Sequence, residues 1–424
     1  MSESLHTAKN NRGRAPRALR PVVVTALAAA LLAGAATPAL ATADGKAVPK
    51  ATAEQDRPEL QKAIQAIVDA GFLGMQMRVN DERGEWVGST GQRKLGASAK
   101  PPTNGLFRIG STTKPFIATV VLQLVADGKL GLDAPVADYL PEFKLDRRIT
   151  VRMLLQHTSG LYAYTGEFRP DGSVESGIPA AGKEWVDNRF KTYQPEELVR
   201  FALSRPARFE PGTSWSYSNT NYTLAQLLIE KVTGHSIAEE MQRRILRPLK
   251  LRGTVVPGTS PELPGPHAHG YYRYQDAGQW KVVDVTRQNP SMVAGAGDMI
   301  STTKDLHTFF SALNRGRLLP AKLLAEMRKP HPKSGALVYG LGVSVQDLGP
   351  NCGTVLHHNG STAGGYVSVM YGTPDGKKTL TASITYGDAA PDTTKAFPKA
   401  LDNLLKQVFC DGQAGSADED KPAQ

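Results

Sequence analysis

A serine and a lysine three positions apart precede a strongly apolar stretch of this 424-residue chain. Residues at positions i and i+3 of a helix share a face, so Ser111-x-x-Lys114 would place an amine beside a hydroxyl. The N-terminus of a helix adds free backbone N–H groups and a positive partial charge, which favour the oxyanion formed when a serine attacks a carbonyl. A desolvated lysine has a lowered pKa and can accept the proton of that serine. The pattern therefore predicts acyl transfer through a covalent intermediate.

The tetrapeptide alone is a weak signal, because Ser301-x-x-Lys304 repeats it. The second copy has the features of ordinary helix capping, with a hydroxyl residue before the helix and Asp305 in its first turn. The first copy opens a helical pattern at residues 111–126 that is apolar on most sides and would hold both side chains in place. The first copy is therefore the candidate nucleophile site.

A tyrosine and an asparagine two positions apart offer a second pair of polar groups. Tyr217-x-Asn219 occurs once in the chain, and residues two apart in an extended segment point the same way. Tyr217 could relay a proton between the serine and a leaving amine if neighbouring cations depress its pKa. Asn219 could hold Lys114 and a substrate carbonyl, and it also suits a helix N-cap before residues 222–233.

A histidine and a glycine supply the third motif. His358-x-Gly360 occurs once and follows an apolar strand pattern at residues 354–356, and a glycine there lets the backbone approach a ligand closely. Histidines also cluster at 357–358 and 267–269, but no Asp or Glu group completes a metal site at either place. We therefore expect neither a metal nor a cofactor.

The elements that must position these residues follow from hydrophobic periodicity. Strands near both ends of the chain enclose a helical middle, which predicts an α/β (α+β) fold. We expect a discontinuous catalytic domain at 57–149 and 290–411 and a mainly helical domain at 150–289. The predicted helices cover residues 57–68, 111–126, 151–156, 195–204, 219–233, 236–246, 303–314 and 394–409. The predicted strands cover residues 72–79, 85–89, 281–285, 339–346, 354–358, 366–371 and 378–386.

The two ends of the chain have the composition of segments outside the fold. Residues 1–43 resemble a secretory signal peptide, with five basic residues before an apolar run at 22–36 and small residues suited to cleavage around 39–43. The run is shorter than the ~20 residues that span a bilayer, so cleavage and secretion are favoured over an uncleaved anchor. The small, charged tail at 412–424 is predicted to be disordered.

Composition excludes several classes of protein. The formal charge of +10 lies partly in the leader and forms no basic stripe elsewhere, so nucleic-acid binding is not expected. Two cysteines, Cys352 and Cys410, are too few for a thiolate metal cluster. Outside the cell an even count favours a disulfide between them, and two separate buried thiols are the alternative.

The three motifs stand in an order that points to a known family. The supporting stretches are residues 107–114, 154–161, 217–222, 269–271, 300–303, 339–342 and 358–360. Together they resemble the secreted serine D-alanyl-D-alanine carboxypeptidases that share the class C β-lactamase fold. The resemblance implies an antiparallel sheet flanked by terminal helices, with an inserted all-helical domain and an active site in the cleft between them.

The resemblance also implies a role for each motif residue. Ser111 would be the nucleophile, Lys114 and Tyr217 the proton-transfer pair, Asn219 an amide contact to substrate, and His358 an electrostatic neighbour of Tyr217. Asn359, Gly360 and Ser361 would border the substrate, and the backbone N–H groups of Ser111 and Ser361 would form the oxyanion hole. The implied partners are peptidoglycan-type D-Ala-D-Ala peptides as substrates and β-lactams as covalent inhibitors or substrates. We expect the protein to be a monomer. A disulfide like Cys352–Cys410 also occurs in close carboxypeptidase relatives.

Two departures from the family pattern bear on specificity. Those carboxypeptidases supply an arginine for the substrate carboxylate after their Tyr-Gly-Leu-Gly stretch, whereas residues 343–346 here contain no cation. Asn359 stands where they have a hydroxyl residue. A buried carboxylate without a charge partner binds less favourably. The alternatives on this scaffold are a β-lactamase, a D-aminopeptidase, an esterase or a non-catalytic penicillin-binding protein.

Overall fold

An antiparallel sheet built from both ends of the chain is the centre of the computed structural model, which describes residues 56–168, 174–362 and 364–410. The strand order is β2-β1-β13-β12-β10-β9, and β11 adds to β12. Their bounds are β1 Gly74–Asp81, β2 Gly84–Gly91, β9 Ser344–Asp347, β10 Thr354–His357, β11 Gly360–Ser361, β12 Tyr366–Gly372 and β13 Thr379–Thr385. The expected antiparallel sheet is confirmed. The leader and the tail predicted from the sequence lie outside the described residues.

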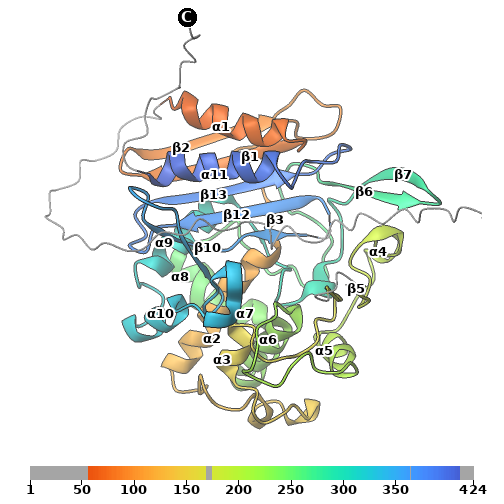
Figure 1. Ribbon diagram of the computed structural model, residues 1–424, viewed down its shortest axis with the longest axis vertical. Helices are drawn as coiled ribbons and strands as arrows, with labels where there is room; N and C mark the ends of the chain where they lie inside the picture. The colour runs from red at the N-terminus through yellow and green to blue at the C-terminus, as the bar shows by residue number, and fades with distance from the viewer. Residues whose placement is uncertain (1–55, 169–173, 363, 411–424) are drawn as a thin grey trace, which may run out of the picture.

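The two terminal helices cover one face of this sheet, as Figure 1 shows for α1 (Pro58–Asp69) and α11 (Ala396–Phe409). In α1 the apolar residues Leu60, Ile64 and Ile67 recur at helical spacing, so they form one stripe that is fully buried. They pack in one cluster with α11 and with strand residues such as Met77, which lies opposite Ala382 on β13. This pairing joins the N-terminal and C-terminal parts of the chain in one sheet.

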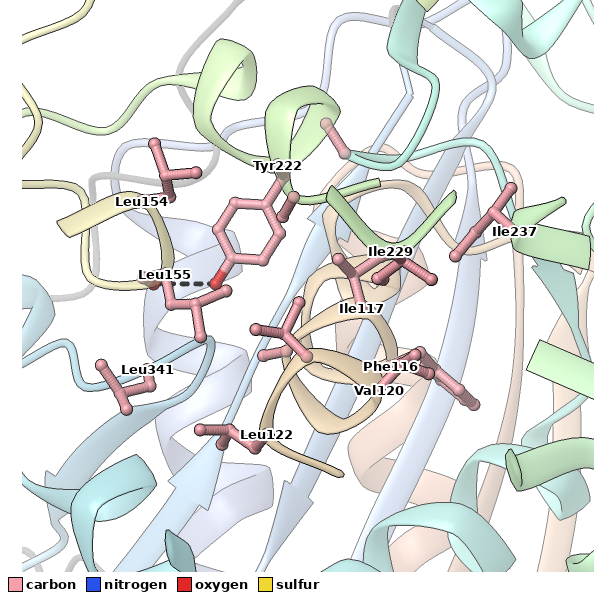
Figure 2. Packing of buried hydrophobic residues seen from close by; sticks show 14 of the residues in the cluster. Phe116, Ile117, Val120, Leu122, Leu154, Leu155, Tyr222, Ile229, Ile237 and Leu341 are labelled. Atoms are coloured by element: carbon pink, nitrogen blue, oxygen red, sulfur yellow. Dashed lines mark hydrogen bonds between the residues drawn. The ribbon is translucent and has the colours of Figure 1, made fainter. Parts of the chain in front are cut away.

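Helix α2 (Thr113–Ala126) lies behind the opposite face and is buried over most of its surface. Its β-branched residues Ile117, Val120 and Val121 lower the intrinsic helix propensity, so tertiary packing must stabilise it. Figure 2 shows these packing partners: α2 lies beside α6 (Asn219–Thr233), whose Tyr222 donates a hydrogen bond of 2.8 Å to the Leu155 carbonyl. The predicted central helix is confirmed, and the residues of its first turn are buried in the core.

The remaining elements form the layer of helices below the sheet in Figure 1 and short strands at its edge. The helices are α3 Val151–Leu155, α4 Gly182–Asn188, α5 Pro195–Leu203, α7 Ile237–Met241, α8 Arg247–Leu249, α9 Thr303–Asn314 and α10 Ala321–Arg328. The strands are β3 Phe107–Arg108, β4 Glu167–Phe168, β5 Val174–Glu175, β6 Tyr271–Asp276, β7 Gln279–Asp284 and β8 Ile300–Ser301. Helix α9 packs on the sheet face opposite the terminal helices and contacts β1, β12 and β13.

The strand predicted at residues 339–346 is too long, since β9 begins only at Ser344. Gly342 has a φ of +85°, and a Cβ there would lie 2.6 Å from the Cβ of Ala118 in α2. The Tyr339–Gly342 segment therefore turns tightly against α2 before the strand starts. Three of the described helices, α4, α8 and α10, were not predicted, and each is no longer than eight residues.

The two cysteines form a disulfide that ties the loop after β9 to the end of α11. This confirms the predicted pairing of Cys352 with Cys410. Within the described residues, none of the helices is long and apolar enough to cross a membrane.

Candidate active site

The serine and lysine of the first motif lie side by side at the start of α2. A 3-10 turn at Gly110–Thr112 precedes the helix, and Lys114 Nζ lies 3.2 Å from Ser111 Oγ. The hydroxyl of Thr112 points the other way and bonds to Ser368 Oγ at 2.7 Å, which fastens the turn to β12. The helical spacing thus places the amine beside the hydroxyl, as predicted.

The contacts of the Lys114 amine determine which way the proton moves. Nζ lies 2.9 Å from Asn219 Oδ1 and 2.8 Å from the Ala296 carbonyl oxygen. Both oxygens accept hydrogen bonds and cannot donate, so they take two N–H groups of the amine. In a neutral amine the remaining position is a lone pair, and it is directed toward Ser111. The geometry therefore suits Lys114 as the base for the Ser111 hydroxyl.

Burial favours this neutral form of Lys114. The side chain is fully buried, and desolvation holds its pKa well below the usual value, while the charge of Asp298 opposes the shift. The rings of Tyr217 and Tyr222 lie 4.7 and 5.4 Å from Nζ and retain some attraction for the charged form. Lys114 can therefore release and accept a proton within the core.

The Tyr217 hydroxyl is placed to give a proton. Its oxygen is buried, and its nearest polar neighbour is the Ser111 side chain, which is not within full hydrogen-bond geometry. Burial raises the pKa of Tyr217 and outweighs the lowering by nearby Ser111. The expectation that cations depress this pKa is wrong, because the neighbouring lysine is itself desolvated. Tyr217 is thus a phenol that can donate to a leaving group.

Asn219 is the first residue of α6, and Ser218 precedes it in an extended conformation. The Asn219 side chain accepts a hydrogen bond from Lys114. Asn219 is not the N-cap of α6, because the helix already begins at this residue. Its amide nitrogen is left to meet a substrate carbonyl, because the lysine takes the oxygen.

His157 is a site residue that the sequence reasoning did not single out. It is fully buried, has a φ of +65°, and its ring lies 4.3 Å from that of Tyr217. Nδ1 faces the Ser218 backbone N–H at 3.3 Å and Asn221 Nδ2 at 3.1 Å, so it accepts and the ring is neutral. Burial lowers its pKa well below the usual value, in agreement. In the sequence, His157 was marked only by lying in the family-like stretch at residues 154–161, and that stretch did not assign it a role.

His358 is also a neutral ring. Its Nδ1 lies 2.8 Å from the Asn359 carbonyl oxygen, so that nitrogen carries the proton, and Nε2 accepts from the Tyr339 hydroxyl at 3.0 Å. Burial, with a smaller contribution from Lys114, lowers the pKa of His358 to about 3. Any influence of His358 on Tyr217 is therefore that of a dipole and not of a cation. No group of three or more potential metal-ligating side chains occurs in the described part of the chain.

The edge strand β11 brings a second backbone donor to Ser111. A Cβ on Gly360 would lie 2.0 Å from the Ile109 oxygen and 2.8 Å from the Ser111 nitrogen, so only glycine permits this approach. The N–H of Thr362 bonds to the Tyr366 oxygen of β12. Because N–H groups alternate along a strand, that of Ser361 faces away from β12 and toward Ser111.

Asn359 does not share this orientation. Its Nδ2 donates to the Tyr371 hydroxyl at 3.0 Å, and its Oδ1 is buried without a partner among the described residues. The expectation that its side chain borders the substrate is not met in this arrangement, because the amide turns toward β12.

The second copy of the tetrapeptide has the capping role expected for it. The Thr302 side chain accepts a hydrogen bond from the Asp305 N–H and caps α9. Ser301 is fully buried in β8, where its hydroxyl pairs with Thr254 at 2.9 Å.

A pocket that is open to solvent lies next to Ser111. Its lining also includes Asn219, Ser361 and the aromatic residues Trp185 and Tyr193. Within the described residues, Tyr217 is not part of its lining. Ser111 therefore borders this pocket, whereas the Tyr217 hydroxyl is buried outside its lining.

This sheet with its terminal helices and serine–lysine pair defines a β-lactamase/transpeptidase-like fold. The Beta-lactamase family model matches residues 60–403, so the chain belongs to this family. It is 31% identical over 332 residues to penicillin-binding protein 4* of Bacillus subtilis (strain 168), covering 76% of this chain and 69% of that protein. The chain is therefore a serine hydrolase of the penicillin-binding type.

Two solved structures are similar over most of their length. A D-stereospecific amidohydrolase from Streptomyces sp. has a TM-score of 0.72 and 37% identity, with 84% of this chain and 99% of that chain covered. The D-amino acid amidase from Ochrobactrum anthropi SV3 has a TM-score of 0.70 and 27% identity, with 83% and 98% covered.

The state of Lys114 predicts the pH dependence of acylation. The neutral amine is the base, so the second-order rate of Ser111 acylation by a fluorescent penicillin should fall as the pH drops through the lowered pKa of Lys114. Because the pKa of Tyr217 is raised, no matching fall should occur at mildly alkaline pH. Lys114→Gln should acylate about 10²–10⁴-fold more slowly and lack the acidic limb. A rate that rises on acidification would contradict this assignment.

Because β11 approaches the Ser111 turn closely, adding one methyl group at Gly360 should strongly affect the rate of acylation. Gly360→Ala should slow acylation about 10²-fold or more, because the backbone donors near Ser111 must move apart. Gly265→Ala is a matched control, since its Cβ would meet only the end of the Leu106 side chain, at 3.0 Å. The measurement is single-turnover acylation with both variants checked by circular dichroism. Equal rates for the two variants would show that the donors are not held by this contact.

Proposed function

We propose that the protein is a serine amidohydrolase for amides and short peptides of D-amino acids, acting through an acyl-enzyme on Ser111. The observation that carries this proposal is the buried Lys114 amine, held by two carbonyl oxygens at 2.8 and 2.9 Å and directed at Ser111 Oγ. The preference for D-amino acids is supported by the two similar amidohydrolases, each of which matches more than four-fifths of this chain.

The first half of the reaction forms the acyl-enzyme. Ser111 Oγ attacks the amide carbonyl and gives its proton to Lys114, while the Ser111 and Ser361 N–H groups stabilise the oxyanion. Collapse of the tetrahedral intermediate breaks the C–N bond, and Tyr217 protonates the leaving amine. The Lys114 ammonium then returns a proton to Tyr217, which leaves both groups neutral.

The second half restores the serine. Water attacks the ester carbonyl and gives a proton to Lys114, and collapse of the second intermediate releases the acid. Lys114 returns this proton to Ser111 Oγ, so no net charge remains in the site. β-Lactams would acylate the same serine, because their strained amide presents the same carbonyl.

A D-Ala-D-Ala carboxypeptidase is the second candidate, and the 31% identity to penicillin-binding protein 4* favours it. Its substrate would bring a terminal carboxylate to the leaving-group side. Residues 343–346 supply no cation for that group, and Val343 and Ser344 are buried. We therefore rank the amidohydrolase first. The leader at 1–43 supports export, so we propose that either activity acts outside the cell.

The test compares D-phenylalanine amide, its L enantiomer and a diacylated peptide ending in D-Ala-D-Ala. We expect hydrolysis of the D-amide with a kcat/KM at least about 10²-fold above that of the L-amide, and loss of activity in Ser111→Ala. Thr308→Ala, a substitution of a half-buried residue on α9 outside the pocket lining, is the control variant. Faster release of D-alanine from the peptide would favour the carboxypeptidase, and turnover of neither substrate would overturn the proposal.

A further inference from the structure

Three cations line the pocket beside Ser111. These are Arg108, Arg189 and Lys191, and none of them forms an ion pair within the described residues. Other arginines in the helical layer do meet carboxylates: Arg148, Arg152, Arg208, Arg243 and Arg244. Positive groups therefore outnumber negative ones along the described lining of this pocket.

The cations at the outer wall are held in place by other contacts. Arg189 donates to the Val186 oxygen at 2.6 Å and leaves its Nε buried without a partner among the described residues. Its guanidinium lies 4.6 Å from the Phe190 ring, and Lys191 Nζ lies 4.8 Å from the Tyr193 ring. These aromatic contacts orient the cations but do not neutralise them.

The loop that carries these cations is hydrogen-bonded to the segment at residues 289–291. The Asn289 N–H donates to the Arg189 oxygen at 2.8 Å, and Asn289 Nδ2 donates to Thr192 Oγ1 at 3.0 Å. The Tyr193 N–H donates to Ser291 Oγ at 3.0 Å. The wall is therefore preorganised, and it can bind a group without first ordering a loop.

One acidic residue opposes these charges. Asp298 is the acid among the described pocket-lining residues, and it is 6% exposed. Burial raises its pKa to about 7, with Lys114 acting in the opposite direction. Near neutral pH this carboxyl is only partly ionised, so the positive charge of the pocket dominates.

We propose that this pocket binds an acyl group that carries its own carboxylate, and that Arg189 and Lys191 are the residues that recognise it. The pocket takes the acyl part of the substrate because it lies beside Asn219 and Ser361, whereas the proton donor for the leaving group, Tyr217, is outside its lining. The inference rests on the proposed function and narrows its substrates to acidic D-amino acid derivatives or other anionic acyl donors.

The test uses three penicillins that differ at one carbon of the acyl side chain. Benzylpenicillin carries hydrogen there, carbenicillin a carboxylate and ampicillin an ammonium. We expect acylation of Ser111 to be about tenfold faster with carbenicillin than with ampicillin, with benzylpenicillin between them and with the spread reduced at high salt. Equal rates for all three, or the reverse order, would overturn the proposal.

Substitutions of Arg189 and Lys191 test whether these residues produce the order of the three acylation rates. In Arg189→Gln/Lys191→Gln the three rates should converge to within about twofold, whereas Arg189→Lys should keep the order because it keeps the charge. Lys183→Gln is the matched control, since Lys183 lies on helix α4 just before the 189–191 segment but pairs with Asp187 and is outside the described pocket lining. If the order of acylation rates persists in the double variant, other groups must produce it and the assignment to Arg189 and Lys191 is wrong.

A parallel pair of amides separates this inference from the proposed function. The α-anilides of D-glutamate and D-glutamine have nearly the same shape and differ in charge. Preferential hydrolysis of the glutamate compound supports both proposals. Hydrolysis of both at equal rates supports the amidohydrolase and rejects the anion preference. If neither anilide reacts while the penicillins keep their order, the amidohydrolase proposal fails and the anion preference stands.

Discussion

The activity of this fold depends on keeping one lysine amine out of water. Lys114 loses its hydration in a core formed by α2, α6 and the Ala296 segment, and that loss makes it a base. The cost of burying the amine is offset by two carbonyl acceptors and by neighbouring tyrosine rings. The buried helix α2 is the element that makes this possible, because an exposed helix would leave the same side chain solvated and charged.

The second constraint is the close approach of two backbones. Gly110 lies against the Ser361 backbone, and Gly360 lies against the backbone of Ile109 and Ser111, with no room for a Cβ at either glycine. These contacts join the serine turn to the edge of the sheet. Sheet and helical layer are thereby fixed relative to each other at the point where the oxyanion forms. Hydrogen bonds from Thr112 and Ser368 to backbone carbonyls of the same region fasten it further.

The sequence was sufficient to predict the sheet, the terminal helices and the serine–lysine pair, because these depend on periodicity and local spacing. The helices at 219–233 and 303–314 have the predicted bounds for the same reason. Orientation and burial could not be predicted in this way. Asn359 turns to Tyr371, the pKa of Tyr217 rises, and His157 becomes a neutral support for the Tyr217 segment, and each outcome depends on distant chain segments. The cationic wall at 189–191 has no local signature either, since it forms only where that loop meets residues 288–292.

The central claim is that Lys114 is a neutral amine in the resting enzyme. The direct measurement is a ¹³C NMR titration of protein labelled at lysine Cε, with the Lys114 signal assigned by its absence in Lys114→Arg. We predict that this signal titrates well below the surface lysines and has the shift of a neutral amine while those lysines are still protonated. A Lys114 signal that stays in the ammonium form until the surface lysines titrate would contradict the account.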